Sequence, residues 1–163
     1  MYLRIAGYMT VVAIIAKLLF FLLNLPQQTM AISAMFTNLL VVLVGSFFAV
    51  RHYKISNATS NIKSEIKAGM RSTTMFALFI SLFVYIYYSY IDTHYFPNMI
   101  AERVALAAEN PEVDLDQVRT TGEMLFSPKI HASITLFGLT IIGAIYSIVL
   151  ALLMRKFYDP KRF

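Results

Sequence analysis

The stretch that decides the fold is residues 73–91, which read TTMFALFISLFVYIYYSYI. These 19 residues carry no charge. At a helical rise of about 1.5 Å per residue, such a stretch crosses a hydrocarbon core of about 30 Å. A basic segment precedes the stretch and an acidic segment follows it. We therefore predict a membrane-spanning helix whose two ends lie in different surroundings.

Three further apolar runs are nearly as free of charge. Together with the first they predict four spans, at about residues 5–25, 30–50, 73–91 and 130–154. The composition agrees, because 58% of the residues are hydrophobic and 14% are charged, whereas soluble domains carry about 25% charged residues. We expect an all-α, polytopic membrane protein in which residues 1–163 form a single four-helix membrane domain.

The positive charges are distributed unevenly between the connections. Lys and Arg number five in the loop expected over residues 51–72, four in the C-terminal tail, none in the turn between the first two spans, and three beside seven acids in the insert 92–129. The positive-inside rule then places both termini and the basic loop in the cytoplasm and the acidic insert outside. These flanks account for the net charge of +5, so we expect no nucleic-acid partner.

The basic loop contains a helical pattern. Ile62, Ile66 and Met70 recur every four residues. A cationic row follows one position later, formed by Lys63, Lys67 and Arg71. We expect a helix that lies on the anionic inner surface of the membrane, in contact with lipid, before it turns into the third span. We interpret the row as a topology anchor, and the alternative is a binding patch for lipid or a partner.

The acidic insert predicts two short amphipathic helices. The first starts at Pro97, a favoured first-turn residue, and the second starts after Asp114 as N-cap, with Gln117 three residues later. Asn110 and Pro111 separate them. We expect a helical hairpin over the outer ends of the bundle, and Ser127 then caps the last span.

Lys17 interrupts the first span at a depth of about 12 Å. An unpaired cation there costs at least about 2.5–3.5 kcal/mol. Asn38 falls at a matching depth in the second span, as do Tyr85 in the third and Thr135 or Thr140 in the fourth. These residues predict a polar layer. In one interpretation the layer is a site for an ion, a lipid headgroup or a small molecule. In the other it has only a structural role, and Lys17 snorkels or is satisfied by Asn38 and a backbone carbonyl.

Three polar residues near the outer ends of the third and fourth spans are candidate metal ligands. Asp92, His94 and His131 lie near the outer helix ends and could converge on a metal ion. Their spacing matches no ligand signature, and we expect no metal and no other cofactor.

In the last span a row of small residues recurs every four positions, namely Gly143, Ser147 and Ala151. It would let another helix approach closely, either within this chain, which we favour, or in a partner.

The chain resembles a family of small four-helix inner-membrane proteins from bacteroidete-type bacteria, known as a domain of unknown function. The resemblance rests on Tyr85 to Asp92 (YIYYSYID), on Ser127-Pro128 before the final span, and on Lys67-Ala68-Gly69. It implies the bacterial inner membrane. Relatives are often encoded near a polyprenyl-phosphate glycosyltransferase, so the resemblance also implies a cell-envelope setting and such an enzyme as partner. It implies no catalytic residues.

Known catalytic and nucleotide-binding motifs are absent, and the chain contains no cysteine. We therefore predict a non-catalytic accessory or interaction subunit of a membrane complex. A second hypothesis is a small carrier or channel that uses Lys17 and Asn38. A third is an enzyme or helper acting on a lipid-linked substrate, with Asp92 or Glu102 facing a headgroup. Oligomeric state is left open.

Overall fold

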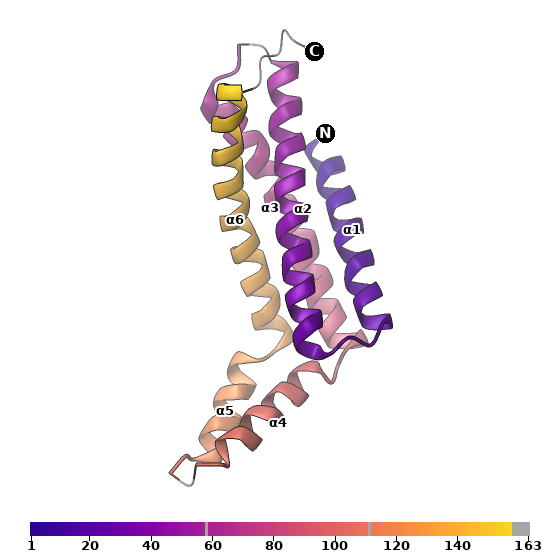
Figure 1. Ribbon diagram of the computed structural model, residues 1–163, viewed down its shortest axis with the longest axis vertical. Coiled ribbons are helices and arrows are strands. Elements are labelled where there is room, and N and C mark those ends of the chain that lie inside the picture. The colour runs from indigo at the N-terminus through magenta and orange to yellow at the C-terminus, as the bar shows by residue number, and fades with distance from the viewer. Residues whose placement is uncertain (58, 111, 158–163) are drawn as a thin grey trace. The chain divides into compact units, whose positions relative to one another are not determined.

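The computed structural model describes residues 1–57, 59–110 and 112–157. The described residues form six α-helices and one π-helical turn and contain no strand, which confirms the all-helical prediction. In chain order they are α1 (Tyr2–Leu22), α2 (Gln27–Ser56), α3 (Ile62–Ile86), η1 (Tyr87–Ile91), α4 (Tyr95–Ala107), α5 (Leu115–Leu125) and α6 (Pro128–Phe157) (Figure 1). Two predicted features, the break at Pro111 and the last two basic residues of the tail, Lys161 and Arg162, lie outside the described residues.

Four helical segments are long and apolar enough to cross a membrane: α1, α2, α3 continued by η1, and α6. Within these segments, only 22% to 39% of the residues in the most apolar part are buried. Large apolar side chains such as Leu40, Leu82 and Phe137 are instead 59% to 66% exposed. A water-soluble bundle would not leave so much contiguous apolar surface open. These helices indicate a membrane protein.

The basic segment differs from the expected loop. α2 continues to Ser56, and α3 starts at Ile62 and runs past Ser72 without a break, so no separate surface helix turns into the third span. The reason is local: Ser72 and Thr73 are fully buried, and the Thr73 hydroxyl donates to the carbonyls of Gly69 and Met70. The polar side chains at the expected boundary between the basic loop and the third span are satisfied inside one continuous helix.

The chain packs as two compact units rather than as one. Of the described residues, the first unit contains those in the ranges 1–80 and 136–157, and the second contains those in the range 81–135.

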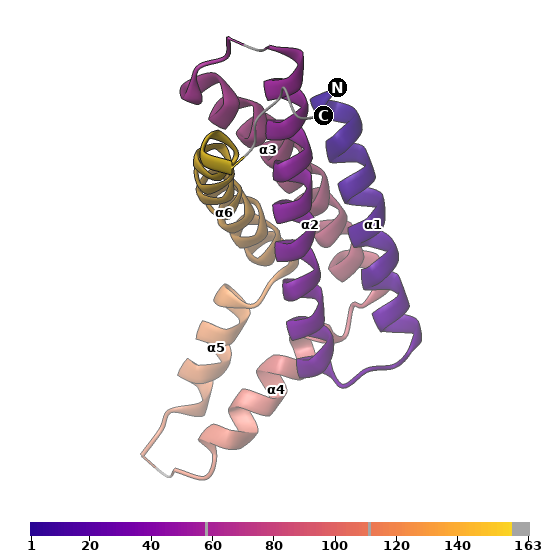
Figure 2. The ribbon, with the colours of Figure 1, turned by 45° about the horizontal axis from the view of Figure 1, so that its top comes forward.

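In the first unit, α1, α2 and parts of α3 and α6 run side by side (Figures 1 and 2). α1 and α2 are joined by a short turn in which Asn24 adopts φ 48°, a left-handed conformation that Asn tolerates. The two helices are antiparallel, and Met9 of α1 packs against the backbone of Gly45 in α2. Buried core residues come from all four helices, for example Ala6, Val42, Phe76 and Ala151.

In the second unit, α4 packs on α5, as the hairpin prediction requires. Gly122 of α5 lies against Ile100 of α4, and the Arg103 guanidinium stands 4.4 Å from the centre of the Phe126 ring. Asp114 caps α5, because its Oδ1 accepts from the backbone N–H groups of Asp116 and Gln117 at 2.9 and 3.2 Å. The predicted N-cap is therefore confirmed.

Candidate functional site

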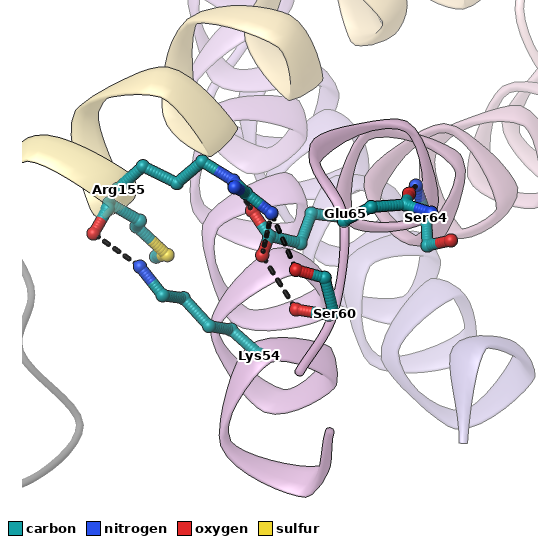
Figure 3. Close-up of polar contacts among 7 residues, drawn as sticks. Lys54, Ser60, Ser64, Glu65 and Arg155 are labelled. Atoms are coloured by element: carbon teal, nitrogen blue, oxygen red, sulfur yellow. Dashed lines mark hydrogen bonds and ion pairs between the residues drawn. The ribbon is translucent and has the colours of Figure 1, made fainter. Parts of the chain in front are cut away.

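The strongest polar cluster lies where α3 begins and α6 ends, at one end of the first unit (Figure 3). Glu65, in the first turn of α3, is 1% exposed and forms an ion pair with Arg155 in the last turn of α6. Arg155 Nε donates to Glu65 Oε2 at 3.0 Å, and Arg155 Nη2 donates to Oε1 at 3.0 Å. This two-pronged geometry is the strong form of an arginine–carboxylate contact.

Two residues from the α2–α3 region complete this cluster. The Ser60 hydroxyl donates to Glu65 Oε1 at 2.6 Å, while the Ser60 carbonyl accepts from Arg155 Nη2 at 2.6 Å. Lys54, near the end of α2, donates from Nζ to the carbonyl of Met154 at 2.6 Å (Figure 3). The last carbonyls of a helix lack partners in their own helix and attract cations. The Glu65 cluster, meaning Lys54, Ser60, Glu65 and Arg155, thus ties three helix ends together.

The predicted cationic row lies at the same end of the first unit. The N-terminus of α1 and the C-terminal ends of α2 and α6 lie together there (Figure 1). Lys63, Lys67 and Arg71, which follow in the first turns of α3, are exposed, whereas Glu65 between them points inward. The arrangement concentrates positive charge at one end of the unit, as an anionic membrane surface would favour.

The small-residue row of α6 faces helices of its own chain. The hydroxyls of Ser147 and Ser46 (α2) lie 3.0 Å apart, and Ser147 also donates to the Gly143 carbonyl at 2.6 Å. A Cβ atom at Gly143 would lie 2.6 Å from Thr73 Cβ, and one at Gly69 would lie 2.8 Å from Ser147 Cβ. α6 therefore approaches α3 at distances that only glycine permits.

Ala151, the third member of the row, is fully buried beside Val50 and Met154, with Ile62 and Ile66 packed around them. With Gly143 and Ser147 also buried, the whole row is occupied within the chain. It is not a free surface for a partner.

The predicted polar layer is distributed between both units. Lys17 is 7% exposed, Asn38 is half-buried, and the Thr140 hydroxyl donates to the carbonyl of Leu136 in its own helix at 2.7 Å. Thr135 bonds in the same way to His131 at 2.9 Å. Tyr85 belongs to the second unit and is 43% exposed. Every buried polar side-chain atom in the described part of the chain has a hydrogen-bond partner.

The three metal candidates of the second unit have separate environments. Asp92 Oδ2 accepts from the Tyr87 hydroxyl at 3.5 Å, and His94 is exposed immediately before α4. The ring of His131 stands edge-on to Tyr88, with 5.2 Å between ring centres. Among the residues that the structure describes, no group of three or more His, Cys, Asp or Glu side chains could hold a metal ion.

His131 instead belongs to an aromatic cluster in the second unit. Tyr88 is its centre, with ring-centre distances of 4.9 Å to Tyr87, 4.6 Å to Tyr95 and 5.0 Å to Phe96. Burial raises the pKa of Tyr95, a hydrogen bond with Tyr88 lowers it, and Asp92 raises it further. Tyr95 therefore stays a neutral phenol at physiological pH.

Sequence reasoning missed the Glu65 cluster. The sequence did offer one signal, because Glu65 is the single acid among five basic residues in the segment 51–72. Its partner Arg155 is 90 residues away, in the basic C-terminal tail that the sequence explains by membrane orientation alone.

Comparison with known protein families places the chain as follows. Residues 4–156 match the model of the family described as "Protein of unknown function (DUF4199)". The chain belongs to this family. As a DUF4199 member it matches over nearly its whole length, including both units and all of the Glu65 cluster. Searches of curated proteins and of solved structures found no match. The predicted membership in a domain-of-unknown-function family is confirmed.

Proposed function

We propose that this DUF4199 protein is a non-catalytic accessory subunit of a cell-envelope complex in the bacterial inner membrane. Both termini and the Glu65 cluster lie in the cytoplasm in this proposal, and α4 and α5 lie outside. The uneven distribution of Lys and Arg supports this orientation. Apart from Lys17 and Lys129, the basic residues of the four long helices belong to the ends of α1, α2, α3 and α6 that lie together in the first unit.

The observation that carries the proposal is the surface of α4 and α5. These short helices expose large apolar side chains: Leu106 is 61% exposed, Met124 72% and Leu125 56%. The connection between the two helices carries exposed acids, including Glu109 and Glu112. An apolar surface rimmed by charge is typical of a protein-docking site. The small-residue row of α6 is occupied by helices of the same chain, so we assign partner docking to the α4–α5 surface.

The partner we propose is a membrane protein whose extracytoplasmic face carries apolar side chains with Lys or Arg around them. A polyprenyl-phosphate glycosyltransferase is the first candidate, on the genomic neighbourhood that the family resemblance implies. Complementary charge would speed the encounter and select the partner.

The experiment is site-specific photo-crosslinking in native membranes. A photoreactive residue at Leu106 or Met124 is expected to trap one defined membrane protein, while the same residue at Val149, a 46% exposed position on α6, traps none. Charge reversal by Glu109→Lys and Glu112→Lys is expected to lower the yield from Met124. Equal crosslinking yields from Leu106, Met124 and Val149 would reject the docking surface. So would the absence of crosslinks from Leu106 and Met124.

The burial of Lys17 favours a second candidate, a small carrier or channel subunit that uses Lys17 and Asn38. Ionisable residues inside membrane spans are costly and commonly belong to ion or substrate pathways. This candidate predicts ion flux into vesicles that contain the purified protein, and its loss with Lys17→Leu. If the vesicles stay tight to K⁺, Na⁺, H⁺ and Cl⁻, the ion-channel form of this candidate is wrong.

A further inference from the structure

A long apolar groove runs along the first unit between α1 and α2. Its volume is about 640 Å³, and it is lined by α1 from Met1 to Val12 and by α2 from Leu40 to Ile55. This volume falls within the range of about 300–1,000 Å³ that is usual for small-molecule sites. The lining is almost entirely apolar, and its charged or titratable side chains are Arg4, Tyr8, Arg51 and His52.

Along α1, the length of the groove matches one leaflet of a bilayer, while the lining on α2, from Leu40 to Ile55, extends over about 22 Å. Met1 and Val12 are 11 residues apart, which corresponds to about 17 Å along a helix. Half of a hydrocarbon core of roughly 30 Å is about 15 Å. A single lipid tail extended along the groove would therefore reach from the membrane surface to near the midplane.

The charged members of the lining lie at one end of the groove. Because α1 and α2 are antiparallel with Met9 against Gly45, the residues before Met9 lie beside those after Gly45. Arg4 and Arg51 therefore share the end of the groove at which the basic ends of the helices gather. None of the described residues that line the groove is acidic. Guanidinium groups bind phosphate through paired hydrogen bonds.

We propose that this groove binds one anionic phospholipid, with an acyl chain between α1 and α2 and the phosphate at Arg4 and Arg51. Charge complementarity selects this occupant over a second copy of the chain. A parallel copy in the same membrane would place its own Arg4 and Arg51 at the same depth, so the like charges would repel. The proposal concerns a defined site, in contrast to the diffuse attraction that Lys63 and Lys67 exert at the surface.

The first test measures lipid retention by the full chain, using native mass spectrometry from detergent with added phosphatidylglycerol or phosphatidylcholine. We expect one phosphatidylglycerol to be retained in preference to phosphatidylcholine. Arg4→Gln with Arg51→Gln is expected to weaken phosphatidylglycerol binding roughly 25-fold, about fivefold for each arginine. The matched control is Lys63→Gln with Lys67→Gln, which removes two charges from the same end but outside the groove lining.

The second test fills the groove without changing charge. Val44 lines it, whereas Leu43 is a neighbouring exposed position that does not. Val44→Trp is expected to abolish retention of phosphatidylglycerol, and Leu43→Trp is expected to preserve it. A phosphatidylglycerol analogue with a photoreactive group in the acyl chain should label the wild-type protein within the groove.

Three results would overturn the proposal. One is an equal loss of binding in the Arg4/Arg51 and Lys63/Lys67 variants, which would show diffuse attraction only. Another is unchanged binding in Val44→Trp. The third is a dimer mass that disappears with Val44→Trp, which would assign the groove to a second copy of the chain.

Discussion

At the scale of single residues, the buried carboxylate of Glu65 is the most consequential group in the first unit. It is 1% exposed, and its charge is compensated by Arg155 and by the Ser60 hydroxyl. The pair is buried on its acid side only, because the Arg155 side chain is 39% exposed. Removing Arg155 would leave the buried Glu65 charge uncompensated. The pair therefore links the first turn of α3 to the last turn of α6.

Arg155→Gln is expected to lower the free energy of unfolding by about 3 kcal/mol, because Glu65 keeps its burial and loses its cation. The double variant Glu65→Gln/Arg155→Gln should recover a large part of this loss, since no charge is then buried unpaired. Reversible unfolding in a mixed-micelle denaturant series measures the free energy of unfolding of both variants. Lys156→Gln, at the neighbouring exposed position, is the control and should stay near wild type.

At the scale of helices, close approach explains the path of α6. Gly143 lies against Thr73 of α3, and Ser147 lies against Gly69, so two glycines set the separation of these helices from both sides. Where lipid tails are as apolar as the side chains, such close backbone packing is the main force that holds helices together.

Gly143→Ala tests this packing. The new Cβ would lie 2.6 Å from Thr73 Cβ, so the helices must separate and the protein should lose about 1–3 kcal/mol of stability. Gly138→Ala is the matched control in the same helix, because a Cβ there meets no heavy atom within 4 Å. Greater helix propensity should make that variant neutral or slightly more stable. Thermal unfolding in detergent compares the two, and equal behaviour would refute the close-packing account.

The helices were largely predictable from the sequence, and the reasons differ between elements. Apolar runs longer than 18 residues and the Asp114 cap are local signals, so the four long helices and α5 follow directly. The continuity of α3 through Ser72 depends on burial against other helices, which no local pattern reveals. The Glu65 cluster was missed for the same reason, because its partners are 90 residues apart.

At the scale of the whole molecule, orientation is the property on which the proposed function depends. The sequence predicts Asn57 on the cytoplasmic side and Glu112 outside, and both residues are exposed. The chain contains no cysteine, so single-cysteine labelling needs no background mutations.

We expect a cysteine at Glu112 to react with a membrane-impermeant maleimide added outside intact spheroplasts. A cysteine at Asn57 should react only after the membrane is opened. Each variant is the control for the other. The reverse pattern would invert the orientation, and labelling of both in intact spheroplasts would contradict the four-span arrangement.

The link between Glu65 and Arg155 also bears on biosynthesis. A ribosome that has just translated α3 has made the acid but not its counter-charge, which follows 90 residues later. During that interval Glu65 must remain hydrated at the membrane surface or be shielded by the insertion machinery. The final helix thus supplies the counter-charge, and a chain truncated before α6 would lack the partner of Glu65.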